Sequence, residues 1–182
     1  GNGGREHTIA WKIAQSPKVE KVVCVPGNGG TAKESKCTNV EIKNCSYISG
    51  DENPYVQIAK HEGCTMAVIG PEDPLAEGLA DEFWNAGIPC VGPKKQAAQL
   101  EASKDLSKEF MEKYGVACAK SRTFTDKKQA EAYVKEHGAP IVIKADGLAA
   151  GKGVTVAATI DEAIKAIDDI MNSGRVGDAG KK

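Results

Sequence analysis

Two lysines and a run of small residues give this chain its clearest chemical signal. Lys144 directly follows a β-branched run at residues 141–143 that predicts a strand, and a second such run follows at residues 154–156. Between them lies Ala-Asp-Gly-Leu-Ala-Ala-Gly-Lys-Gly, which contains Lys152. Small residues at the tip of a hairpin let a ligand approach the backbone closely, and N–H groups beside two ammonium groups suit several phosphate charges. The pattern predicts a phosphate-binding flap at residues 147–153.

The flap differs from a Walker A loop in its spacing and in the element after it. A Walker A loop has four residues between its first glycine and its Gly-Lys pair, then Ser or Thr, then a helix. Here three residues separate Gly147 from Gly151, Gly153 follows Lys152, and a strand is predicted next. A flexible hairpin with solvated lysines is the simplest alternative, and the residues favour a nucleotide site over it.

Three further turns of small residues lie in the first half of the chain, at residues 1–4, 26–30 and 70–72. The first would begin a helix, whose N-terminus directs donors at an anion, and the other two come after short apolar runs that predict strands. Ligands of parallel α/β sheets bind beyond the carboxyl ends of the strands. We therefore expect the three turns to converge, with Glu72 at the edge of a ligand site.

A dinucleotide-binding Rossmann domain also needs an acid about 20 residues beyond its glycines, to hold the ribose hydroxyls. Cys24, Val25 and Pro26 occupy that region, and Glu20 lies at the start of the predicted strand, which is its wrong end. The residues therefore argue against NAD.

Strands that alternate with helices predict a parallel sheet covered on both faces over residues 1–95. The glycine turn at residues 1–4 has no strand before it in the sequence, so we expect one to precede Gly1 in the whole protein. The N-caps expected for the last two helices are Thr125 and Thr159. The expected strands are 20–25, 40–43, 66–69 and 88–91, and the expected helices are 8–15, 55–62, 75–86, 105–114, 126–137 and 160–171.

Composition excludes several classes of partner. A net charge of −1 offers no general attraction to nucleic acid or to an anionic membrane, and no apolar run approaches the roughly 20 residues of a membrane span. The six cysteines form no Cys-x-x-Cys pair, which favours reduced thiols in a cytoplasmic protein. No pair of histidines has metal-ligand spacing. We expect neither a nucleic-acid nor a membrane partner, and no metal ligands can be assigned.

Five motifs together resemble those of the glycinamide ribonucleotide synthetases, a family of ATP-grasp ligases. They occur in the family's order and spacing along essentially the whole chain, and each alone would be weak. They are Gly-Asn-Gly-Gly-Arg-Glu-His (1–7), Pro-Gly-Asn (26–28), Gly-Pro-Glu (70–72), Gln-Leu-Glu-Ala-Ser-Lys (99–104) and Lys-Ala-Asp-Gly-Leu-Ala-Ala-Gly-Lys-Gly (144–153).

The resemblance implies an α/β fold with two parts. A Rossmann-like (pre-ATP-grasp) parallel-sheet domain would occupy residues 1–95, and the first lobe of an ATP-grasp domain would occupy residues 96–182. It also implies an ATP-dependent ligase of purine biosynthesis that joins glycine to 5-phosphoribosylamine through glycyl phosphate, with the flap excluding water from that intermediate. The resemblance also allows fusion to, or association with, other purine-pathway domains.

The resemblance also assigns roles to individual residues. Lys144 and Lys152 would be catalytic. The residues expected to bind ATP are Lys104, Lys144, Gly151, Lys152 and Gly153. The residues expected to bind phosphoribosylamine are Gly3 and Gly4, at its phosphate, and Glu72, at its ribose hydroxyls.

Part of the family's active site is expected outside this segment. Mg²⁺ or Mn²⁺ would accompany ATP, with ligands beyond residue 182, so we expect residues 1–182 alone not to turn over. Two alternatives stay open at this point. One is another ATP-grasp carboxylate–amine ligase, and the other is a non-catalytic nucleotide-binding or assembly module of a larger polypeptide.

Overall fold

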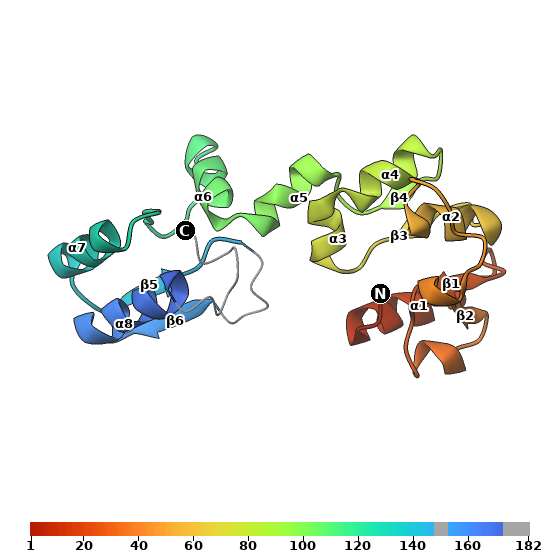
Figure 1. Cartoon of the computed structure of the whole chain (residues 1–182), viewed down its shortest axis with the longest axis horizontal. Coiled ribbons are helices and arrows are strands. Elements are labelled where there is room, and N and C mark those ends of the chain that lie inside the picture. Colours follow the sequence, from red (N-terminus) through yellow and green to blue (C-terminus); the bar gives the residue numbers. More distant parts are fainter. Residues whose placement is uncertain (148–152, 173–182) are drawn as a thin grey trace. The chain divides into compact units, whose positions relative to one another are not determined.

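The structure is a computed structural model that describes residues 1–147 and 153–172. The chain forms two compact units, Gly1–Ala98 and Gln99–Lys182 (Figure 1). Each unit has its own apolar core. The elements that begin in the first unit are α1 (Gly4–Ala14), β1 (Val22–Cys24), η1 (Thr31–Lys33), β2 (Cys37–Asn39), η2 (Ile42–Asn44), α2 (Pro54–His61), β3 (Ala67–Val68), α3 (Glu72–Glu77), α4 (Leu79–Asn85), β4 (Cys90–Val91) and α5 (Lys95–Ala102).

Strands pair in parallel in the first unit, as the alternation of strands and helices predicts. β1 pairs with β2, with Val22 opposite Cys37, and β3 pairs with β4, with Ala67 opposite Cys90. The predicted helix face of Leu75, Leu79 and Phe83 is buried and forms the centre of the core.

Three predicted elements of this unit are wrong in position. The strand expected at residues 40–43 is instead β2, and residues 42–44 form the 3-10 turn η2. β2 has no apolar pattern of its own, and its pairing with β1 creates the strand. The helix expected at residues 75–86 begins at Glu72 and is broken at Gly78, whose φ of 105° is one that L-residues rarely adopt. The first helix also begins earlier than expected, at Gly4.

The second unit is built on the predicted hairpin. β5 (Ile141–Lys144) and β6 (Val154–Ala157) pair antiparallel, with Lys144 opposite Val154, and the helices are α6 (Lys104–Lys113), α7 (Lys127–His137) and α8 (Ile160–Met171). Val134 of α7 and Ile167 of α8 are buried in one cluster, against which Ile141 and Ile143 pack. One face of the hairpin is therefore covered by α7 and α8.

The N-cap expected for α8 is confirmed and the one expected for α7 is wrong. The Thr159 side chain accepts a hydrogen bond from the Glu162 N–H (3.2 Å). For α7 the cap is Asp126 rather than Thr125, and its carboxylate accepts from the Gln129 N–H (2.9 Å). A carboxylate at the positive end of a helix is favoured by charge as well as by geometry.

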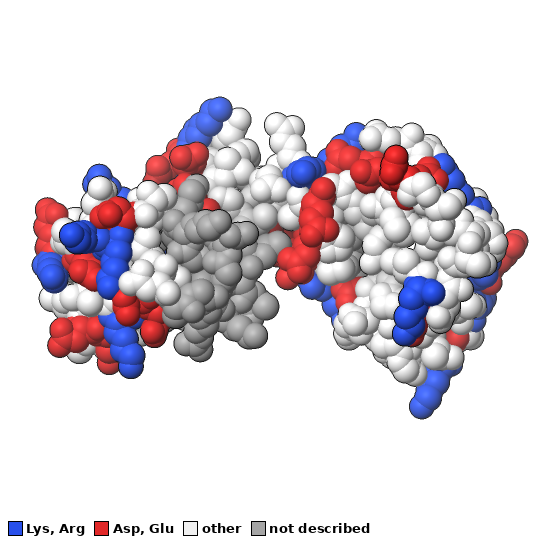
Figure 2. Space-filling view, in the orientation of Figure 1, with Lys and Arg blue, Asp and Glu red and all other residues white. Residues whose placement is uncertain are grey.

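The surface and the cysteines agree with the composition. All six cysteines are free thiols, as expected. Basic and acidic side chains are intermixed on the face that Figure 2 shows, in keeping with the small net charge. Within residues 1–147 and 153–172, no helix has the length and apolar character needed to cross a membrane.

Candidate functional site

The three small-residue turns of the first unit converge. The Gly27 N–H donates to the Gly1 carbonyl (3.2 Å), so the turn after β1 meets the start of the chain. Arg5, in the first turn of α1, donates to the Glu72 carboxylate at the start of α3 (2.8 Å). This convergence is what the parallel-sheet argument predicts for turns at the carboxyl ends of strands.

Asn28 holds two of these turns together. Its side-chain amide donates to the carbonyls of Asn2 (3.0 Å) and Gly3 (3.3 Å), while its side-chain oxygen accepts from the N–H groups of Gly30 (2.8 Å) and Thr31 (2.9 Å). The peptides at the start of α1 therefore have a fixed orientation before any ligand binds.

The two glycines predicted to contact a phosphate lie in different surroundings. The Gly3 N–H already donates to Oε2 of Glu6 (2.9 Å), and a Cβ added at Gly3 would lie 2.5 Å from that oxygen. A Cβ added at Gly4 would meet no heavy atom within 4 Å. Of the pair, Gly4 therefore faces open space, whereas the N–H of Gly3 is engaged within the protein.

Glu6 is a residue of this site that sequence reasoning missed. Its carboxylate is largely buried beside Gly3 and Gly70, and a Cβ at Gly70 would lie 2.6 Å from its Oε1. The ion pair of Oε1 with Arg5 Nε spans 3.3 Å. The signal available in the sequence was an acid three residues after the glycine that caps α1, which is the spacing of a capping box.

Glu72 is ionised more readily than an ordinary glutamate. Its pKa lies below the ordinary value of 4.5, chiefly because its carboxylate accepts its own backbone N–H and also because it is bonded to the Arg5 guanidinium. The carboxylate is therefore an acceptor for hydroxyl groups at neutral pH. Because its folded pKa is depressed, the stabilisation from this pair is present above pH 4.5 and is lost as the pH falls through the folded pKa.

Replacing Arg5 by alanine is expected to raise the pKa of Glu72 while leaving it below 4.5, because the backbone contribution remains. The carboxyl carbon of Glu72, followed by NMR from pH 2 to 7, would measure this change. Lys21→Ala is a matched control, because Lys21 pairs with Glu62 instead (2.8 Å). An unchanged titration of Glu72 in Arg5→Ala would show that the pair does not form in solution.

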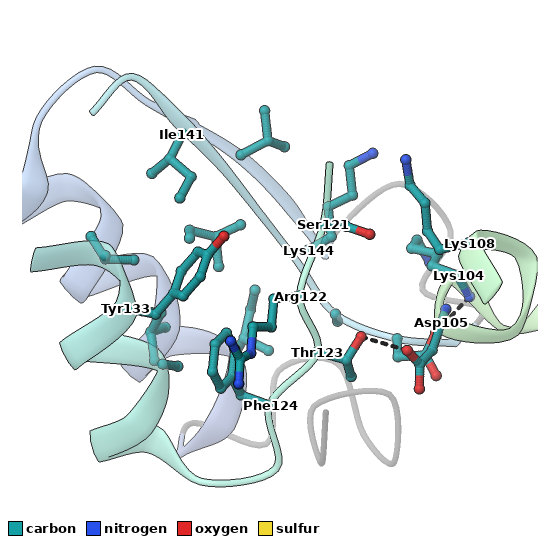
Figure 3. A pocket seen from close by; sticks show the side chains of 18 of the residues that line it. Lys104, Asp105, Lys108, Ser121, Arg122, Thr123, Phe124, Tyr133, Ile141 and Lys144 are labelled. Carbon is teal, nitrogen blue, oxygen red and sulfur yellow. Dashed lines mark hydrogen bonds between the residues drawn. The ribbon is translucent and has the colours of Figure 1, made fainter. Parts of the chain in front are cut away.

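The second unit contains a cavity of about 610 Å³ into which several basic side chains open. Lys104 and Lys108 line it from α6, and Lys144 lines it from the end of β5 (Figure 3). Arg122 and Phe124 line it from the segment before α7, where the Arg122 guanidinium lies 5.9 Å from the centre of the Phe124 ring. The structure thus brings two lysines predicted from the sequence, Lys104 and Lys144, to one cavity.

The surface around Lys144 combines a charge with apolar side chains. Lys144 and Val142 lie on the face of the hairpin that α7 and α8 leave uncovered, opposite Val154 and Val156. Val142 and Val154 are each 46% exposed, and Val156 is 74% exposed. An ammonium group beside exposed valines suits a ligand with an anionic end and a flat apolar end.

Asp146 was not selected from the sequence, yet its carboxylate accepts hydrogen bonds from three residues of this unit. Its Oδ1 accepts from the backbone N–H groups of Lys104 (2.6 Å) and Asp105 (3.1 Å), and its Oδ2 accepts from the Ser103 hydroxyl (3.1 Å). The Lys104 ammonium donates to the Gly147 carbonyl (2.7 Å). The only local signal was an acid placed between a strand and a glycine.

The predicted flap is described only at its two ends. Gly147 has a φ of 111°, and the Gly153 carbonyl accepts from the Ala145 N–H (2.8 Å), which extends the hairpin by one bond. Gly151 and Lys152 lie outside the described residues. No group of three His, Cys, Asp or Glu side chains in the described parts of the chain could hold a metal ion.

Comparison with protein families matches both units. The model "Phosphoribosylglycinamide synthetase, N domain" matches residues 1–101, and "Phosphoribosylglycinamide synthetase, ATP-grasp (A) domain" matches residues 102–182. The phosphoribosylamine–glycine ligases of Neisseria meningitidis serogroup B and Ralstonia nicotianae are each 50% identical over the whole chain. The chain covers 41% and 42% of those two proteins, so it spans about two fifths of their length.

Solved structures confirm the predicted α/β fold. The phosphoribosylamine–glycine ligase of Thermotoga maritima matches 98% of this chain with a TM-score of 0.69 and 30% identity, and 40% of that protein is covered. The biotin carboxylase domain of the Hydrogenobacter thermophilus 2-oxoglutarate carboxylase matches 95% of the chain with a TM-score of 0.69, and 40% of that chain is covered. At 20% identity, the second match supports the fold alone.

Proposed function

Because the chain belongs to the phosphoribosylglycinamide synthetase family, we propose that it is part of an ATP-dependent ligase that joins glycine to 5-phosphoribosylamine. The observation that supports this most directly is the shared cavity of Lys104 and Lys144 beside the exposed valines of the hairpin. In this proposal the two ammonium groups neutralise the phosphates of ATP, and the valines contact its base. Lys152, Gly151 and Gly153 would cover the phosphates from the flap.

The proposed reaction has two steps, a phosphoryl transfer and an acyl transfer. An oxygen of the glycine carboxylate attacks the γ-phosphorus of ATP, the bond to the β–γ bridging oxygen breaks, and ADP leaves. The amine of phosphoribosylamine then attacks the carbonyl carbon of glycyl phosphate, and phosphate leaves as the amide forms. Phosphoryl transfer depends on positioning and charge neutralisation, and these are what the basic cavity provides. Lys104 and Lys144 would stabilise charge on the transferring phosphoryl group.

The first unit is proposed to hold phosphoribosylamine. Gly4, which faces open space at the N-terminus of α1, would donate to the phosphate, while Gly3 would shape the turn through its bond to Glu6. Glu72, ionised at neutral pH, would accept from the ribose hydroxyls. The domains proposed for these two roles are residues 1–95 for the substrate and residues 96–182 for the nucleotide.

Mg²⁺ or Mn²⁺ is proposed to accompany ATP and to lower the charge on its phosphates. The described residues provide no carboxylate cluster for the ion, so no step is assigned to it. A cytoplasmic location is proposed, in keeping with six free thiols.

The test is a reaction of the purified full-length protein with ATP, glycine and phosphoribosylamine, in which ADP and glycinamide ribonucleotide are both measured. We expect equal amounts of the two products, and we expect no turnover from a polypeptide of residues 1–182. Faster reaction with another amine in place of phosphoribosylamine would favour a different carboxylate–amine ligase. Tight nucleotide binding without any ligation would favour a non-catalytic module.

A further inference from the structure

Asp146 joins the end of β5 to the beginning of α6. It lies 42 positions from Lys104 in the sequence, yet its Oδ1 is 2.6 Å from the backbone nitrogen of Lys104. Two backbone N–H groups of the first turn of α6 and the Ser103 hydroxyl all bond to this one carboxylate. A carboxylate that accepts several N–H groups at a helix N-terminus is among the stronger polar contacts in proteins, because charge and helix dipole act together.

The contact fixes two lysines relative to each other. Lys144 is the last residue of β5, two positions before Asp146, and Lys104 is the first residue of α6. The Lys104 ammonium is held in turn by the carbonyl of Gly147, the residue after Asp146. Ala145, between Lys144 and Asp146, is fully buried and bonded to Gly153, so this end of the strand is held firmly. The contact of Asp146 with α6 therefore sets the position of Lys104 relative to Lys144.

From this geometry we infer that Asp146 is a positioning residue, which holds Lys104 and Lys144 at the spacing needed to bind the phosphates of ATP. The inference rests on the proposed function of the two lysines. Both oxygens of Asp146 accept hydrogen bonds from the protein, which favours a positioning role over a metal-ligand role. It acts through the lysines and not on the reacting atoms.

The test uses the full-length protein and measures the Kd of a non-hydrolysable ATP analogue by calorimetry, together with the KM of each substrate. Asp146→Ala is expected to raise the Kd of the analogue and the KM of ATP by about tenfold or more, because bonds to a charged group are lost. The KM of glycine should not change. Asp146→Asn is expected to be intermediate, because its carbonyl oxygen can still accept from the Lys104 N–H.

Asp126→Ala is the matched control, because it removes an aspartate cap from α7 in the same unit without touching either lysine. It should lower the denaturant midpoint of unfolding, as loss of an N-cap does, and leave the Kd of the analogue unchanged. A double-mutant cycle tests whether Asp146 acts through the Lys104 side chain. If it does, the Kd of the analogue for the double variant Lys104→Ala/Asp146→Ala should be only slightly higher than the Kd for Lys104→Ala alone.

Three results would overturn the inference. They are an unchanged Kd in Asp146→Ala, an equal rise in Asp126→Ala, and a rise confined to the Mg²⁺ requirement, which would make Asp146 a metal ligand. Failure of the proposed function is seen separately, in the wild-type protein. If the wild type binds the analogue but does not join glycine to phosphoribosylamine, the ligase proposal fails, whereas the Kd series still tests Asp146.

Discussion

Replacing Lys144 by alanine in the full-length protein is expected to lower kcat/KM for ATP by about 100-fold, the typical cost of removing one preorganised group that stabilises charge in a transition state. The strand end that carries Lys144 is held by its buried neighbour Ala145, so the backbone that bears this side chain is fixed before the nucleotide binds. Steady-state kinetics with ATP varied at saturating glycine would measure the loss.

Two further variants make this result specific. Lys128→Ala removes an exposed lysine of the same unit that does not line the cavity, and it should leave the kinetics unchanged. Lys144→Arg keeps the charge but changes its shape and reach, so a partial loss is expected. If Lys144→Ala bound and used ATP as well as the wild type does, the assignment of the phosphate site to this cavity would be refuted.

Replacing Gly27 by alanine is expected to lower the free energy of unfolding by about 3 kcal/mol, from a left-handed backbone and an overpacked contact. Gly27 has a φ of 80°, and an added Cβ would lie 2.2 Å from the side-chain oxygen of Asn39. The Asn39 side chain cannot move freely, because it accepts from the buried Thr31 hydroxyl (2.7 Å) and donates to the Asn28 carbonyl (2.8 Å). Denaturant unfolding would measure the change.

Gly87 provides the matched control for this substitution. Its φ is 76°, close to that of Gly27, but an added Cβ would meet no heavy atom within 4 Å. For Gly87→Ala the free energy of unfolding should therefore fall by only about 1 kcal/mol, the cost of the left-handed backbone alone. Equal losses in the two variants would show that backbone strain, and not the contact with Asn39, determines the need for glycine at position 27.

Much of the local structure could be predicted from the sequence alone. The hairpin of β5 and β6, the helices α2, α6 and α8, and the cap at Thr159 all arise from side-chain periodicity and capping chemistry. These signals are local, because each depends on residues within one or two turns of one another. The family motifs likewise identified Lys104 and Lys144 as candidate ligand-binding residues.

Other features were decided only by the tertiary structure. β2 became a strand because β1 lies beside it, and its own residues carry no strand pattern. The Glu6 carboxylate lies beside Gly70 in a turn far along the chain, and the Asp146 carboxylate contacts the first turn of α6 across 42 positions of sequence. Such contacts join segments that are far apart in the chain, and no local pattern can encode them. The sequence by itself therefore determined the elements and the lysines, whereas the folded chain decided which carboxylates hold the lysines and glycine turns in position.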